Sequence, residues 1–93
     1  MKAKEHESVW DALEDDPVIA ANMKLRSRLM IEISQYVKQS GLTQKEAASQ
    51  LGTTQPRLND VLKGKIDKCT VDRLVNMLSS AGFDVDLNVS RAA

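Results

Sequence analysis

The sequence has very little of what disulfide-stabilised, metal-binding or membrane-spanning proteins require. Its 93 residues include one cysteine, Cys69, and one histidine, His6, so they form neither an internal disulfide nor a zinc cage of cysteines and histidines. No apolar run approaches the roughly 18–20 residues of a membrane helix, and no apolar stretch behind a basic start predicts a signal peptide. We therefore expect a protein of the reducing cytoplasm.

Catalytic patterns are missing as well. The chain has no glycine-rich phosphate loop, no paired-carboxylate spacing and no nucleophile triad, so we expect no enzyme and no cofactor. We also expect no metal, because a lone histidine near a terminus, here His6, is usually just solvated. With only three aromatic residues, the core of this single small domain must be aliphatic.

What the sequence does have is an uneven distribution of charge. Its 13 basic and 13 acidic residues balance overall, yet residues 1–16 carry six acids against two lysines. Residues 17–68 carry nine bases against four acids. An acidic arm followed by a basic middle indicates two different partners, although most individual charges are simply solvated.

Four glycines end stretches of helical periodicity, because the position after a helix favours glycine. Before Gly41, apolar residues recur every fourth position and predict one inward-facing stripe, formed by Leu25, Leu29, Ile33 and Val37. Three threonines are placed to begin further helices, since a threonine side chain caps free N–H groups. They are Thr43, with Glu46 completing a capping box, then Thr54, and then Thr70 after a loop.

After Gly82 the periodicity changes from that of a helix to that of a strand. Phe83, Val85, Leu87 and Val89 alternate with polar residues, which is the period-two pattern of a half-buried strand. A buried strand needs a hydrogen-bonding partner. The candidates are the segment around Val9–Trp10 and the same strand of a second subunit. We favour the second subunit, because twofold symmetry pairs identical elements easily.

The most informative segment, residues 44–61, predicts two short helices joined by a tight turn at Gly52. Ala47 and Ala48 are small enough for the two helices to cross closely, and Leu58 with Val61 closes a miniature core. This segment resembles the helix-turn-helix of the Xre/Cro repressor family, and specifically its subgroup of HigA-like antitoxins from bacterial type II toxin–antitoxin pairs. The likeness extends over residues 8–89, with Thr53 standing where the family more often has an apolar residue. It is carried by residues 8–15, 22–26, 41–47, 55–58 and 74–78.

The resemblance implies a mainly α, lambda-repressor-like bundle of four to five helices with a C-terminal β-strand. It divides the chain into an acidic arm (1–20), a helix-turn-helix DNA-binding domain (21–82) and a C-terminal dimerisation strand and tail (83–93). The third helix then lies in the major groove of DNA. Its side chains that face away from the core become the expected base readers, namely Gln55, Arg57, Asn59 and Asp60.

Contacts to DNA phosphates are expected from other positions. Gln44 stands at the start of a helix, where free N–H groups attract an anion, and several lysines lie close in sequence. The expected set is Gln44, Lys45, Thr54, Lys63 and Lys65. The plain alternative is that the glutamines only favour helix starts and the lysines only add solubility.

The acidic arm holds an apolar cluster of Val9, Trp10 and Leu13. It is either a docking segment for a basic partner such as an RNA-cleaving toxin, or a patch that packs on its own domain or dimer mate. We expect a cytoplasmic, nucleoid-associated bacterial homodimer that represses transcription from a palindromic double-stranded DNA operator and neutralises a cognate toxin. The alternatives are a stand-alone Xre-type regulator and a protein-interaction module without DNA binding.

Overall fold

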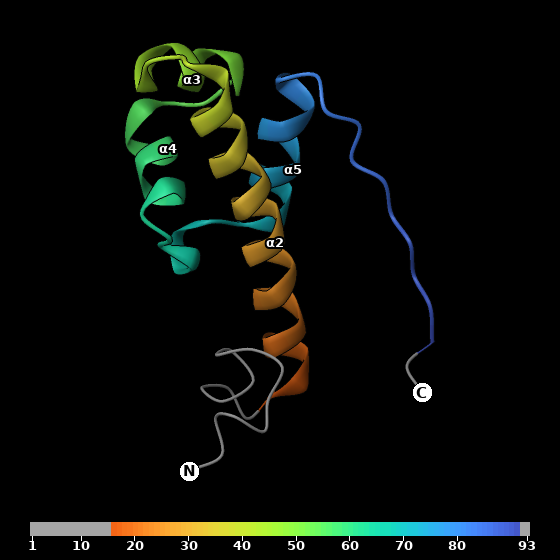
Figure 1. Cartoon of the computed structure of the whole chain (residues 1–93). Coiled ribbons are helices and arrows are strands. Elements are labelled where there is room, and N and C mark those ends of the chain that lie inside the picture. The colour runs from red at the N-terminus through yellow and green to blue at the C-terminus, as the bar shows by residue number, and fades with distance from the viewer. Residues whose placement is uncertain (1–15, 92–93) are drawn as a thin grey trace.

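The computed structural model describes residues 16–91, which form a helical bundle followed by an extended tail (Figure 1). Each helix expected from the sequence is present. The described elements are α2 (Pro17–Ser40), α3 (Gln44–Gln50), α4 (Gln55–Leu62), the 3-10 helix η2 (Ile66–Lys68) and α5 (Val71–Ser80). Expectations for residues 1–15, including the cluster of Val9, Trp10 and Leu13, lie outside the described residues.

The core is aliphatic, as the scarcity of aromatic residues predicts. The long helix α2 packs against α4 and α5, and α3 packs on α4. Ile33, Leu51, Leu58 and Leu74, each from a different part of the chain, are fully buried in one cluster. None of the helices in residues 16–91 is long and apolar enough to cross a membrane.

The three threonine caps begin their helices as the sequence indicates. Thr43 Oγ1 accepts a hydrogen bond from the Glu46 N–H at 3.2 Å, and Glu46 Oε1 accepts one from the Thr43 N–H at 2.9 Å. Thr54 and Thr70 cap α4 and α5 in the same way, at 3.3 and 3.2 Å. These local hydrogen bonds satisfy helix N–H groups that otherwise have no partner, which fixes where each helix begins.

Gly52 makes the turn between α3 and α4. Its φ is +62°, a conformation that side-chain-bearing residues rarely adopt, and a Cβ added there would lie 2.8 Å from Ser80 Oγ. Ser80 Oγ in turn donates a hydrogen bond of 3.0 Å to the carbonyl of Gln50. The turn therefore packs directly against the end of α5, and only glycine fits this position.

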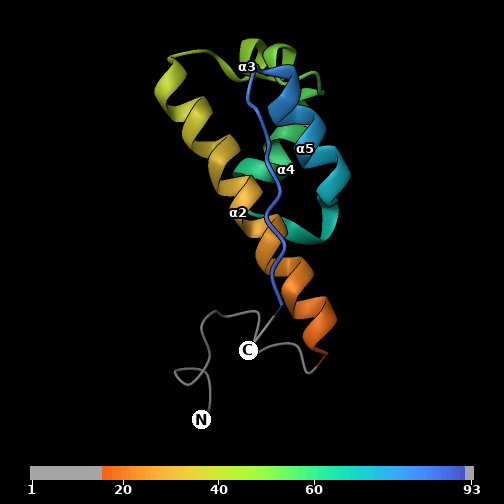
Figure 2. The same cartoon turned by 90° about the vertical axis from the view of Figure 1, so that its right-hand side faces the viewer.

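The predicted inward stripe of α2 is wrong at its first residue. Leu29 and Ile33 are buried, but 48% of Leu25 is exposed. Much of the N-terminal half of α2 extends beyond the other helices (Figures 1 and 2). Yet Met23 still packs against the core and Arg26 donates a hydrogen bond to the carbonyl of Ile66, so the other elements do reach this part of α2. A repeat of four residues drifts around a helix of 3.6 residues per turn, and this drift turns Leu25 away from the buried side.

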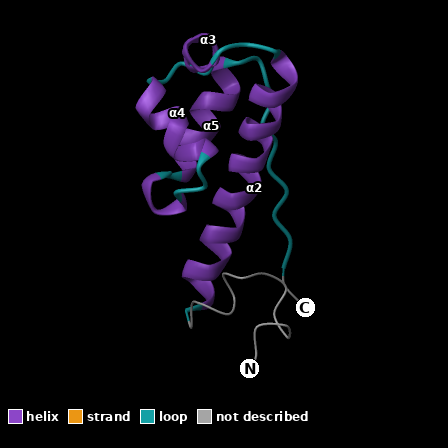
Figure 3. Ribbon diagram, turned by 60° about the vertical axis from the view of Figure 1, so that its left-hand side comes forward, coloured by secondary structure: helices purple, strands orange, loops and turns teal. Residues whose placement is uncertain are grey.

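The predicted C-terminal β-strand is also wrong for the single chain. Residues 83–91 run as an extended segment without strand structure, and no strand occurs among residues 16–91 (Figure 3). The segment leaves the end of α5 through hydrogen bonds from Gly82 and Phe83 to α5 carbonyls. The physical reason is that a ladder needs two edges, and the described part of the chain offers no second edge.

Replacing Gly52 with alanine should lower the free energy of unfolding by about 2–3 kcal/mol. Strain at positive φ contributes about 1–2 kcal/mol, and displacement of Ser80 weakens its hydrogen bond by about 1 kcal/mol. Gly41→Ala is the matched control, because Gly41 has φ +73° but nothing within 4 Å of an added Cβ. The control should lose only the strain energy in urea denaturation. Equal losses in the two variants would contradict the packing role of Gly52.

Candidate DNA-binding site

The outer face of α4 is the centre of the candidate site. Leu58 and Val61 bury one side of this helix, whereas Gln55, at its first position, is exposed. Asn59 and Asp60 are half-buried and lie away from the core side by helical spacing. The inner contacts fix the rotation of α4, so its polar side is presented at a defined angle.

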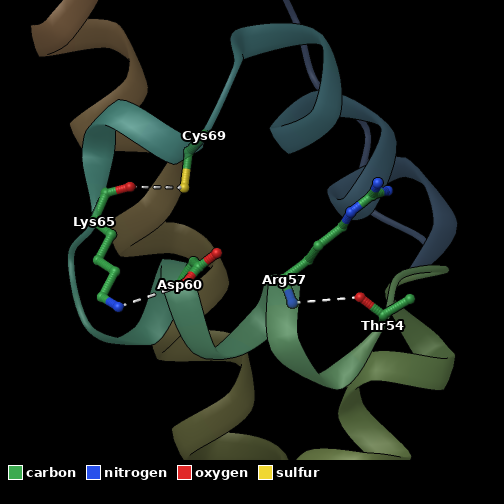
Figure 4. A network of polar contacts seen from close by, with 5 residues as sticks. All are labelled: Thr54, Arg57, Asp60, Lys65 and Cys69. Carbon is green, nitrogen blue, oxygen red and sulfur yellow. Dashed lines mark hydrogen bonds and ion pairs between the residues drawn. The ribbon is translucent and has the colours of Figure 1, made fainter.

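Arg57 is exposed but lies at one edge of α4 and not on its outermost face. Its side chain extends from the first turn of α4 toward α5 (Figure 4). There it lines a surface hollow of about 330 Å³ between the helix-turn-helix turn and the start of α5. The geometry thus separates Arg57 from Gln55 and Asn59, whereas Asp60, three residues later, lies on the same side of α4 as Arg57 (Figure 4).

Asp60 is an acid on a surface that would face phosphates, and its position has a structural explanation. Lys65 Nζ lies 3.8 Å from Asp60 Oδ1, and the Lys65 N–H also donates to the Asp60 carbonyl at 2.9 Å (Figure 4). The Lys65 side chain is about half exposed, so its ammonium group still faces solvent. Asp60 therefore has a local partner that reduces its repulsion of DNA, although such exposed pairs contribute little to stability.

The other expected phosphate contacts are accessible. Gln44 and Lys45 are exposed in the first turn of α3, and Lys63 is exposed at the C-terminal end of α4, directly before Gly64. Thr54 is exposed as well, but its hydroxyl oxygen accepts the Arg57 N–H. The hydroxyl proton of Thr54 is still available to donate to an anion.

The comparison with known protein families agrees with this geometry. The sequence profile of a family described as a helix-turn-helix domain matches residues 12–90. This protein belongs to that helix-turn-helix family. No curated protein matches the chain. The match covers both short helices, the turn at Gly52 and the helices that support them, and it supports DNA binding by this domain.

Sequence reasoning about this helix-turn-helix protein missed Arg73. This residue stands in the first turn of α5, outside the helix-turn-helix segment, and it lines the same hollow as Arg57. The spacing of sixteen residues between the two arginines gave no signal, because a loop and η2 separate them in the chain. Only the packing of α4 and α5 into one core cluster brings them to one hollow.

The residues expected to make a dimer divide into two groups. Phe83 packs edge-on against Tyr36 of α2, with ring centroids 5.6 Å apart, and so begins the tail with a contact inside the chain. Farther along, Leu87 and Val89 are 81% and 79% exposed, while Val85 is 38% exposed. The outer part of the tail is therefore an apolar surface without a partner among the described residues.

Cys69 has a structural environment. It is buried, its thiol donates to the Lys65 carbonyl at 3.4 Å, and burial raises its pKa. A raised pKa keeps the thiol protonated and unreactive at neutral pH. Within residues 16–91, no three side chains of the metal-ligating types come together.

Proposed function

We propose that this helix-turn-helix protein is a sequence-specific transcriptional repressor that inserts α4 into the major groove of DNA. The observation that carries the proposal is the polar outer face of α4, held in position by the fully buried Leu58 and the buried Val61. A reading helix must be both rigid and uncovered, and α4 meets both conditions in the described residues.

Gln55 is the principal base reader in this proposal. A glutamine amide donates and accepts at once, so it can form a two-bond contact with the N6 and N7 atoms of adenine. Its place at the first position of α4 suits the docking mode in which the start of the helix contacts base edges. Asn59 lies one turn farther along the same side and reads a neighbouring base. Asp60 lies toward the edge of this face, where its carboxylate accepts from a cytosine amino group.

Phosphate contacts hold the protein in register on the duplex. Gln44 and Lys45 at the start of α3 grip one strand, and Lys63 and Lys65 after α4 grip the other side of the groove. The positive φ of +74° at Gly64 turns the backbone between those two lysines, so both can be presented outward. Such contacts supply affinity that falls with salt but carry no sequence information.

Replacing Gln55 with alanine should weaken binding to a preferred duplex by about tenfold or more, because one two-bond base contact discriminates by about 1–3 kcal/mol. Preferred duplexes are obtained by selection from a random library with the wild-type protein, and affinities are measured by fluorescence anisotropy. Binding to a random-sequence duplex should not change.

The matched control for this measurement is Gln39→Ala, an exposed glutamine of α2 that lies beside Tyr36 and Phe83 and not beside α4. It should leave both affinities unaltered. Equal binding of preferred and random duplexes by the wild-type protein would refute sequence-specific recognition.

The repressor acts as a homodimer in this proposal, with two copies of α4 in successive major grooves about 34 Å apart on a palindromic operator. The support is the exposed apolar face of residues 83–89. Its alternating pattern suits strand pairing with the same segment of a second copy. Pairing of the two copies supplies the second strand edge, which the described residues of one chain lack.

Replacing Leu87 with lysine should shift the protein from dimer toward monomer in sedimentation velocity, because the substitution places a charge on the apolar face of the segment. The fold itself should be unaffected, because Leu87 is 81% exposed within one chain. Asn88→Lys, on the opposite face of the same extended segment, is the control and should remain dimeric. A dimer that persists unchanged in the Leu87 variant would contradict pairing through this segment.

A second function, neutralisation of a toxin, is proposed on the resemblance to HigA-like antitoxins and on one further feature. The projecting half of α2 exposes Val18, which is 76% accessible, and Leu25 seven residues later. Because residues seven apart lie on one helix face, Val18 and Leu25 form an apolar strip that begins just after the acidic residues of segment 1–16. The strip suits a partner that combines an apolar groove with basic residues, as an RNA-binding toxin would.

The product of the gene adjacent to the repressor's own should co-purify with it if it is such a toxin. Val18→Asp should abolish the co-purification without affecting DNA binding, because a buried charge in the strip opposes docking. Gln35→Glu, an exposed position in the C-terminal half of α2 away from this strip, controls for added charge alone. Failure of the wild-type pair to co-purify would leave a stand-alone regulator as the function.

A further inference from the structure

The hollow beside α4 brings together two arginines that are distant in the sequence. Arg57 comes from the first turn of α4 and Arg73 from the first turn of α5. The hollow measures about 330 Å³, and its wall is completed by mainly polar residues that include Thr53, Thr70 and Asn76.

Neither guanidinium group has a partner in the described part of the chain. The hydrogen bonds of Arg57 and Arg73 are those of their backbone N–H groups to Thr54 and Thr70, and no ion pair involves either side chain. An arginine presents five donors in a fixed fork that matches a phosphate group. Two such forks that line one hollow, with no carboxylate ion-paired to either of them, offer a site for an anion.

The helix ends strengthen this environment. Both arginines stand in the first turn of a helix, where the helix dipole favours negative charge, while Thr54 and Thr70 accept from their own N–H groups. One acid, Asp72, also lines the hollow, so the local charge is one positive unit and not two. This balance suits a phosphodiester, which carries a single negative charge, and it limits the attraction for other anions.

We propose that Arg57 and Arg73 together hold one phosphate of the DNA backbone in this hollow. The inference rests on the proposed DNA binding and changes the part that Arg57 plays in it. The side chain directed toward α5 in Figure 4 positions the protein along the duplex and reads no base. Base reading is left to the outer face of α4, and the register of that face is fixed by an arginine pair beside it.

The test uses the full-length protein with a selected duplex and a random-sequence duplex, each titrated at several salt concentrations. Arg57→Ala and Arg73→Ala should each weaken both duplexes by the same factor, about tenfold. The slope of log affinity against log salt should become shallower by about one for each variant. The double variant should lose less than the product of the two single losses, because both side chains hold the same phosphate.

Asp72→Asn should have the opposite effect on affinity: because it removes a negative charge from the hollow, it should strengthen binding to both duplexes alike. Denaturation midpoints of Arg57→Ala and Arg73→Ala should stay close to the wild type, since neither guanidinium group has a hydrogen bond or ion pair to lose. A loss of preference for the selected duplex in Arg57→Ala would show that Arg57 reads a base. Unchanged affinities in Arg73→Ala would also overturn the proposal. If the wild-type protein bound no duplex, the DNA-binding function itself would be wrong, an outcome distinct from both.

Discussion

The structure depends on the burial of one side of a very short helix. Eight residues of α4 are too few to be helical in water on their own, because nucleation outweighs the gain from so few hydrogen bonds. Leu58 and Val61 lock the helix into an aliphatic cluster with Ile33 of α2 and Leu74 of α5. The same contacts that make α4 helical also set which of its side chains face outward. Stability and recognition therefore share one set of contacts.

Two acidic residues of the helix-turn-helix interact with groups close to them in the sequence. Glu46 closes the capping box of α3, and Asp60 lies beside Lys65. The bases at the two ends of the helix-turn-helix remain exposed to solvent. A protein with no net charge can in this way present a basic edge to DNA, since the field near a surface depends on local arrangement and not on the total.

Several aliphatic side chains are exposed outside the buried cluster in the described part of the chain. The projecting half of α2 and the tail after Phe83 expose aliphatic residues at positions remote from the buried cluster. Exposed apolar side chains of this kind support the contacts with other chains proposed above. The described residues therefore combine an exposed polar side of α4 with exposed aliphatic side chains on α2 and on the tail.

The sequence by itself determined the helices and the turn, because the signals are local. Thr43, Thr54 and Thr70 bond to N–H groups three residues away, and Gly52 supplies a backbone angle that its neighbours cannot. Nearly all of the predicted core followed from periodicity for the same reason. What only the tertiary structure decided depends on which elements meet. Leu25 is exposed because it lies off the buried side of α2, although Met23 beside it packs against the core. Residues 83–91 form no strand because a ladder needs a second edge, and none occurs among the described residues. Arg57 and Arg73 line one hollow because α4 and α5 pack into the same core cluster. Periodicity identifies the face of an element, but contact between distant segments decides whether that face is covered and by what.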